Sequence, residues 1–279
     1  MRLYSIYIYI VSLYILSLYR LKYENPVYIG VPETRFIGAC KIFFAIFCGD
    51  YIIGCMKVTS GYRSLLLPEI LEAHEFFEGG DLYEFGVYSG SSMGEIIKCL
   101  KNKQLDFNCF HGFDSFEGMP KCDVEPTWDQ SWEQGEFNST SLYEKDNVSD
   151  TVHLLNKNLK QLLYKSTQSI NLVPGFYEES LSKINTTDFK PAAILDIDCD
   201  LYSSSITALE FMFKNDLIKP GTIIIYDDWG GSPGYKTFSD GESRAHKEIC
   251  EKYNIKTSLI TAFGQGFPHV HTFFKVVEH

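Results

Sequence analysis

Two kinds of hydrophobic spacing alternate along residues 81–279. Short, nearly continuous apolar runs have the pattern of strands buried on both faces, and they lie at 82–87, 107–113, 169–173, 191–198 and 221–227. Segments with helical spacing follow them, at 92–100, 150–165, 176–184, 203–213 and 241–253. Two late strands are expected at 256–261 and 271–277. This alternation predicts an α/β fold with a doubly wound, mostly parallel sheet of Rossmann-like type.

The first 80 residues differ from this pattern and divide into two parts. Within residues 1–30, no charged side chain occurs at positions 3–19, where Tyr, Ile, Leu and Ser dominate. The length of this stretch is borderline for the roughly 17–25 apolar residues that span a bilayer. Three interpretations fit it: an anchor that associates with a membrane, an amphipathic or packed helix, and a poorly ordered extension. Residues 31–80 are expected to form a helical extension, with helical spacing over 65–77, that packs on the main domain or on a second chain in a homo-oligomer.

The segment 81–93 joins the first strand of the main domain, residues 81–279, to its first helix. Glu84 lies at the end of the strand, and Gly86 and Gly90 permit a tight turn whose backbone comes close to a ligand. Ser92 and the acid three residues later have the spacing of a capping box, which predicts that Ser92 caps the helix. Free N–H groups and the positive end of the helix dipole make such a turn a cradle for a small molecule.

The chemistry of this turn bears on the cofactor. A dinucleotide-binding turn has the pattern G-x-G-x-x-G, whereas this chain has Glu84, Gly86 and Gly90. The carboxylate would repel a phosphate, but it suits S-adenosylmethionine (SAM), which carries an amino group and a sulfonium. The spacing resembles motif I of class I SAM-dependent methyltransferases. Nucleotide binding and an ordinary tight turn are the alternatives.

Asp114 follows the second predicted strand, 28 residues after Gly86. In doubly wound sheets an acid at the end of the second strand binds ribose hydroxyls. The alternative is that Asp114 caps the turn that it begins.

Two groups of acids follow the fourth and fifth predicted strands: Asp196, Asp198 and Asp200 in the first, and Asp227 and Asp228 in the second. Because ligands bind beyond the carboxyl ends of parallel strands, we expect both groups at the edge that carries the glycine turn. Clustered carboxylates must protonate, separate or bind a cation. A set of oxygen ligands suits Mg²⁺ or another hard divalent cation. Capping of a helix and of a loop is the alternative for Asp200 and Asp228.

Charge and cysteine content argue against several classes of partner and site. The chain has 279 residues and a net charge of −11, and no basic patch is visible, which argues against a nucleic-acid partner. Its eight cysteines form no C-x-x-C pair. They are expected to be reduced, buried thiols of a cytoplasmic protein rather than a disulfide framework or a zinc site.

Taken together, several motifs resemble the macrocin O-methyltransferase family, whose members are metal-dependent sugar methyltransferases. The motifs lie in order at 83–92, 113–120, 175–177, 195–204, 220–221, 227–229 and 241–245. The resemblance implies the class I methyltransferase fold, SAM as the methyl donor, and a hydroxyl of a sugar or glycosylated small molecule as the acceptor.

The resemblance also implies residue roles. Glu84, Gly86, Gly90 and Ser92 would hold the methionine part of SAM, and Asp114 its ribose. Asp198, Asp227 and Asp228 would bind the divalent metal. Apart from the resemblance, acid–base chemistry predicts that a carboxylate near the metal takes the acceptor's proton, and Asp198 is the candidate. The polar segment 122–148 would close over the substrate.

Two departures from the family pattern are visible. Asp196 stands where the family often has a basic residue, and Cys199 where it often has glycine. The family's catalytic histidine has no counterpart between Asp114 and Val152. By chemistry alone, the candidates for that role are His153, His246, His269 and His271. A nucleotide- or NAD-linked enzyme and an inactive methyltransferase fold that only binds are the alternatives.

Overall fold

The computed structural model describes residues 62–121, 133–229, 241–266 and 269–278. The predicted segment 1–30, most of the extension 31–80 and the first part of the predicted lid lie outside these residues. The interpretations of residues 3–19 therefore lie outside them as well. Among the helices within the described ranges, none is both long and apolar enough to cross a membrane.

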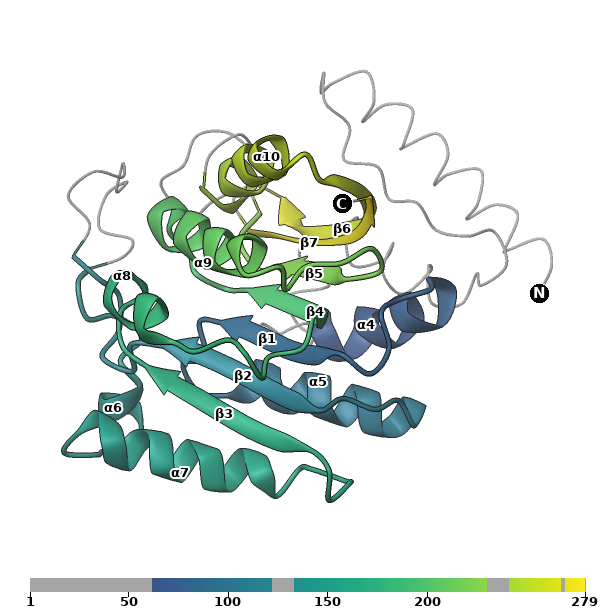
Figure 1. Ribbon diagram of the computed structural model, residues 1–279. Coiled ribbons are helices and arrows are strands. Elements are labelled where there is room, and N and C mark those ends of the chain that lie inside the picture. The colour runs from purple at the N-terminus through teal and green to yellow at the C-terminus, as the bar shows by residue number, and fades with distance from the viewer. Residues whose placement is uncertain (1–61, 122–132, 230–240, 267–268, 279) are drawn as a thin grey trace, which may run out of the picture.

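A seven-stranded sheet forms the centre of the molecule, with the order β3-β2-β1-β4-β5-β7-β6 (Figure 1). The strands are β1 (Asp81–Phe85), β2 (Cys109–Asp114), β3 (Ser169–Pro174), β4 (Ala192–Ile197), β5 (Ile223–Tyr226), β6 (Lys256–Gly266) and β7 (His269–Glu278). Strands β1 to β5 pair in parallel, and β7 pairs antiparallel with both β5 and β6. The predicted mostly parallel sheet is confirmed. Because β7 runs against β5, its first residues lie at the edge where β5 ends.

Helices cover both faces of the sheet (Figure 1). They are α4 (Tyr62–Ala73), α5 (Ser91–Lys103), α6 (Ser139–Leu142), α7 (Val148–Lys160), α8 (Tyr177–Ser180), α9 (Tyr202–Lys214) and α10 (Gly241–Tyr253), with a 3₁₀ turn, η1, at Leu181–Lys183. One core cluster contains residues of α4, α5 and α7, and the other contains residues of α9 and α10. The prediction for α10 is correct to the residue, whereas the helix predicted over 65–77 begins and ends earlier. The short helix α6 lies within the polar segment 122–148 that is predicted to close over the substrate.

Large aromatic side chains fill the space between the sheet and α9. Phe85 of β1 and Phe113 of β2 are fully buried and stack with their ring centroids 4.5 Å apart. Phe211 of α9 meets both rings edge-on. Truncating such a side chain to alanine costs about 3–5 kcal/mol of stability. These contacts fix the ends of β1 and β2, where the predicted ligand-binding residues begin.

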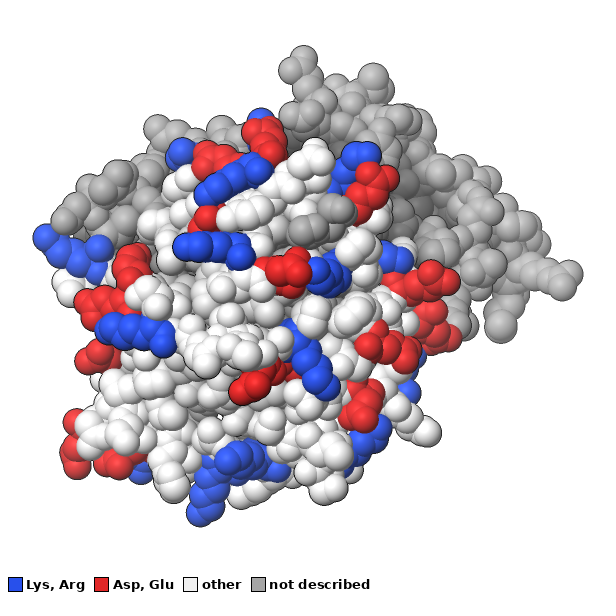
Figure 2. All heavy atoms as spheres, in the orientation of Figure 1, with Lys and Arg blue, Asp and Glu red and all other residues white. Residues whose placement is uncertain are grey.

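The remaining predictions from composition concern the surface and the thiols. On the face in Figure 2, basic and acidic side chains are interspersed, and neither sign gathers into one large patch. Cys99 and Cys199 are buried and Cys109 and Cys250 are partly buried, and all four are free thiols.

Candidate active site

The turn after β1 is held by its own backbone and by Asp114. Gly86 and Gly90 have φ values of 94° and 71°, and Tyr88 between them has 43°. The N–H groups of Val87 and Tyr88 donate to Oδ2 of Asp114 at 2.7 and 2.8 Å. The left-handed φ values explain the two glycines, since such a backbone is strained for other residues.

Gly86 comes close to the protein's own backbone. A Cβ atom at this position would lie 1.8 Å from the carbonyl oxygen of Asp198. The N–H of Asp198 in turn donates to the carbonyl of Phe85 at 2.8 Å. The glycine turn is therefore packed directly on the acidic segment that follows β4, which joins the two predicted parts of the site.

Glu84 is fully buried beneath the turn. Its Oε1 accepts a hydrogen bond from the hydroxyl of Ser92 at 2.6 Å, and its Oε2 has no hydrogen-bond partner among the described residues. Burial, together with the charge of Asp196, raises the pKa of Glu84 well above its usual value. An unpartnered buried oxygen is costly, and the ammonium group of a ligand would satisfy it.

The predicted capping role of Ser92 is wrong. The residue that precedes α5 is Gly90, in the left-handed conformation and without a side-chain cap. The hydroxyl of Ser92 is instead used by Glu84, eight residues earlier. Ser92 therefore orients the acid beneath the turn.

Asp114 accepts hydrogen bonds from backbone N–H groups, as expected for a residue that caps a turn. Capping was the alternative to ribose binding. Besides the two amides of the turn, Asp114 accepts the N–H of Phe116 at 2.6 Å through Oδ1. Burial raises its pKa in spite of these hydrogen bonds. A ribose hydroxyl would thus share a carboxylate that already shapes the turn.

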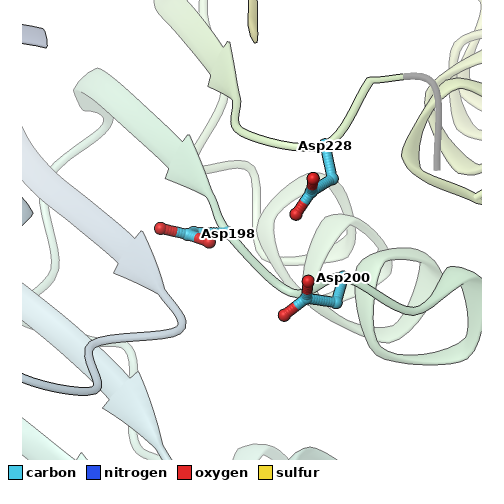
Figure 3. Close-up of side chains that lie close together, drawn as sticks. All are labelled: Asp198, Asp200 and Asp228. Carbon is cyan, nitrogen blue, oxygen red and sulfur yellow. The ribbon is translucent and has the colours of Figure 1, made fainter. Parts of the chain in front are cut away.

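Three carboxylates converge at the ends of β4 and β5. One oxygen each from Asp198, Asp200 and Asp228 lies within 4.8 Å of the others. Figure 3 shows Asp198 and Asp200 on the segment after β4 and Asp228 on the segment after β5. The backbone of Asp200 has a φ of 60°, which turns this segment sharply before α9. We name these three residues the acid trio.

The acid trio does not include Asp227, which the resemblance predicts as a ligand. Oδ1 of Asp227 lies 3.2 Å from Nη1 of Arg63 and 3.3 Å from Nδ1 of His271. Burial alone would raise the pKa of Asp227, but Arg63 and His271 outweigh it and hold that pKa well below its usual range. In contrast, burial and the charge of Asp200 raise the pKa of Asp228 well above its usual value.

Arg63, at the start of α4, is a site residue that the sequence analysis missed. It is only 4% exposed. Its guanidinium pairs with both oxygens of Asp196, and its Nη2 lies 3.1 Å from Oδ2 of Asp198. The one available signal was Asp196 itself, because an acid within an apolar strand requires a cation.

Glu242, at the start of α10, was missed as well. It is fully buried, and its Oε1 and Oε2 accept the backbone N–H groups of Cys199 and Asp228 at 3.3 and 2.9 Å. One side chain thus ties the segment after β4 to the segment after β5. Within the motif at 241–245, the acid in the first turn was the signal.

The candidate histidines lie in different surroundings. His153 is exposed on α7, and the side chain of His269 is not described. His246 is buried between Tyr226 and Thr257, and burial lowers its pKa to about 4. Only His271, among those described, lies beside an acid at the carboxyl edge, where its ring stacks on Tyr62 at 3.8 Å.

Comparisons with known proteins identify the family and the fold. A sequence model of the macrocin-O-methyltransferase (TylF) family matches residues 73–257. No curated protein matches the chain. Among solved structures, the O-methyltransferase NovP is 19% identical with a TM-score of 0.54, over 79% of this chain and 81% of that chain. The calicheamicin methyltransferase CalS11 is 17% identical with a TM-score of 0.50, over 88% of this chain and 86% of that chain.

The two solved structures show a shared fold, and the family model adds the family. Its match covers more than half of the chain, including the glycine turn, the acid trio and Glu242. Arg63 and His271 lie outside the match. The nucleotide- or NAD-linked alternative is set aside, because the chain belongs to the macrocin-O-methyltransferase family and is a SAM-dependent O-methyltransferase.

Proposed function

We propose that this enzyme transfers the methyl group of SAM to a hydroxyl of a sugar or glycosylated small molecule, assisted by a divalent cation such as Mg²⁺. The observation that carries the metal role is the acid trio, whose oxygens lie within 4.8 Å of one another. The sugar acceptor is supported by the family and by NovP and CalS11, which are an O-methyltransferase and a calicheamicin methyltransferase.

The carboxylates of the acid trio suit a hard cation. Asp198, Asp200 and Asp228 offer oxygen atoms only, at a spacing that one ion can bridge while it keeps several waters. We therefore propose these three as ligands. The resemblance also predicts Asp227 as a metal ligand. Because its carboxylate faces Arg63, Asp227 is not one of the three ligands that we propose.

The residues proposed to bind the cofactor suit a cationic methyl donor such as SAM. The unpartnered Oε2 of Glu84 would accept from the amino group of SAM, and Ser92 holds the other oxygen in place. The turn at Gly86 and Gly90 would lie against the methionine part. Asp114 would accept from a ribose hydroxyl in addition to its backbone amides.

The chemistry then requires alignment and a proton acceptor. SAM already carries an activated methyl group, so the protein's main task is to place the acceptor oxygen in line with it. A divalent cation lowers the pKa of a hydroxyl that binds to it. Because Arg63 contacts Oδ2 of Asp198, Oδ1 is left for a ligand or for the acceptor's proton. We keep Asp198 as the catalytic residue of the proposal.

Calorimetry and turnover together test these roles. The Asp228→Asn variant should bind SAM with unchanged affinity and lose methyl transfer by about a hundredfold or more. The Glu84→Gln variant should lose SAM affinity. If Asp228→Asn abolished SAM binding as well, the division between a donor site and a metal site would be wrong.

A further inference from the structure

Arg63 lies at the carboxyl edge of the sheet and is nearly inaccessible to solvent. Its guanidinium contacts three carboxylates, those of Asp196, Asp198 and Asp227, at distances of up to 3.2 Å. A planar fork with five N–H donors can serve several carboxylates at once, whereas an ammonium group is a single point charge.

These contacts divide the acids into two groups. Asp227 is directed to Arg63 and His271, although it is adjacent in sequence to Asp228 of the acid trio. Asp198 belongs to both groups, because Oδ2 contacts Arg63 while the residue also contributes an oxygen to the trio. Without a fixed cation, Asp227 would repel Asp198 and Asp228.

The position of Arg63 is fixed from the opposite end of the chain. Tyr62 stacks on His271 with an angle of 8° between the ring planes and meets Phe273 edge-on. Both Tyr62 and His271 lie outside the residues that the family model matches. The start of α4, packed on the start of β7, therefore brings to this site a cation from outside the matched residues.

We infer that Arg63 is a positioning residue that selects the metal ligands: it withholds Asp227 and one oxygen of Asp198, and thereby leaves Asp198, Asp200 and Asp228 for the divalent ion. This inference rests on the proposed metal site. It predicts that the importance of Asp227 for metal binding depends on the presence of Arg63.

Mn²⁺ binding, measured by electron paramagnetic resonance and calorimetry on the full chain, tests this dependence. The matched variants each remove one negative charge, Asp200→Asn from the acid trio and Asp227→Asn from the group that contacts Arg63. With Arg63 present, Asp200→Asn should weaken Mn²⁺ binding at least about tenfold more than Asp227→Asn does. The affinity for SAM should change by less than about twofold in either variant.

The second arm removes the cation. Arg63→Met alone would leave Asp196 buried without a partner, which destabilises a fold strongly. The double variant R63M/D196N removes both charges, and SAM binding and circular dichroism check that it folds. In that background Asp227 is released, so the tenfold difference between Asp200→Asn and Asp227→Asn should disappear or reverse.

Arg63→Lys is a second route to the same answer, because it keeps the charge but cannot contact three carboxylates, and it should reduce the difference. The R63M/D196N and Arg63→Lys backgrounds could both bind Mn²⁺ and still show the full difference in affinity between Asp200→Asn and Asp227→Asn. That result would overturn the inference but not the metal site. With Arg63 present, equal effects of Asp227→Asn and Asp200→Asn would do the same. If the unaltered protein did not bind Mn²⁺, the proposed metal site would be wrong and the inference with it.

Discussion

A methyl group on Gly86 would lie 1.8 Å from the carbonyl oxygen of Asp198, so the glycine turn and the acidic segment are in backbone contact. No side chain can shift to relieve this clash, and the φ of 94° is itself unfavourable for alanine. The Gly86→Ala variant should therefore be destabilised by about 3 kcal/mol or more in urea unfolding, with loss of activity.

Gly90→Ala is the matched control. Its φ is also positive, at 71°, but the added methyl group would meet only the ends of flexible side chains, those of Leu155 at 3.3 Å and Leu159 at 3.6 Å. We expect a cost of about 1–2 kcal/mol and a folded protein. Equal costs for the two variants would contradict the direct packing of the turn on Asp198.

Glu84→Gln separates SAM recognition from folding. The substitution keeps the shape of a fully buried side chain but removes the charge that would bind the amino group of SAM. A hydrogen bond to a charged group contributes about 1.5–3 kcal/mol, so SAM should bind about ten- to a hundredfold more weakly. Stability should be retained, because Oε2 has no partner to lose among the described residues. Unchanged SAM affinity would exclude Glu84 from the donor site.

Glu242→Gln tests the link between the two acidic segments. A glutamine has a single acceptor oxygen, and its amide N–H₂ would face one of the two backbone N–H groups that Glu242 now accepts. Metal affinity should fall about tenfold or more, while SAM affinity stays close to that of the unaltered protein. Glu251→Gln on the same helix is the control, since Glu251 is exposed. An equal loss of metal affinity there would argue against a specific role of Glu242.

The pair of Asp81 and His111 predicts a pH dependence of stability away from the active site. Nε2 of His111 lies 3.1 Å from Oδ2 of Asp81, and both side chains are buried. Burial alone would lower the pKa of His111, but its hydrogen bonds, first that to Asp81, outweigh burial and raise it. The histidine therefore stabilises the fold fully below its unfolded pKa of about 6.5, and this contribution is lost as the pH rises through the folded value.

Urea unfolding of the unaltered protein and of His111→Gln, at several pH values from about 5.5 to 9, checks this sign. The difference in unfolding free energy between them should shrink as the pH rises. The exposed pair of Glu72 and Lys103 supplies a control, because breaking it by Glu72→Gln should cost less than about 1 kcal/mol. A difference that grew with pH would contradict a raised pKa of His111.

Local patterns were enough to predict the sheet and the glycine turn. Hydrophobic periodicity located the strands and α10, because buried parallel strands and amphipathic helices differ in spacing over a few residues. The two glycines were identified correctly as a turn. The close approach that they permit proved to be to Asp198, a partner that no local pattern specifies.

The sequence could not predict how the acids are paired. Arg63 and Asp196 are 133 residues apart, and the contact depends on how α4 packs on the sheet. The acid trio contains Asp200 and not Asp227 because of the directions of their side chains. The turn at Asp200 directs one, and the ion pair with Arg63 directs the other. Ser92 satisfied a local rule for helix capping, but the buried acid of Glu84 took its hydroxyl.

The most direct measurement is methyl transfer from SAM to a panel of glycosides, with the product identified by mass spectrometry, in Mg²⁺ and in EDTA. The account predicts a methylated glycoside with Mg²⁺, none in EDTA, and full recovery when Mg²⁺ is restored. Undiminished transfer in EDTA would contradict the metal role of Asp198, Asp200 and Asp228.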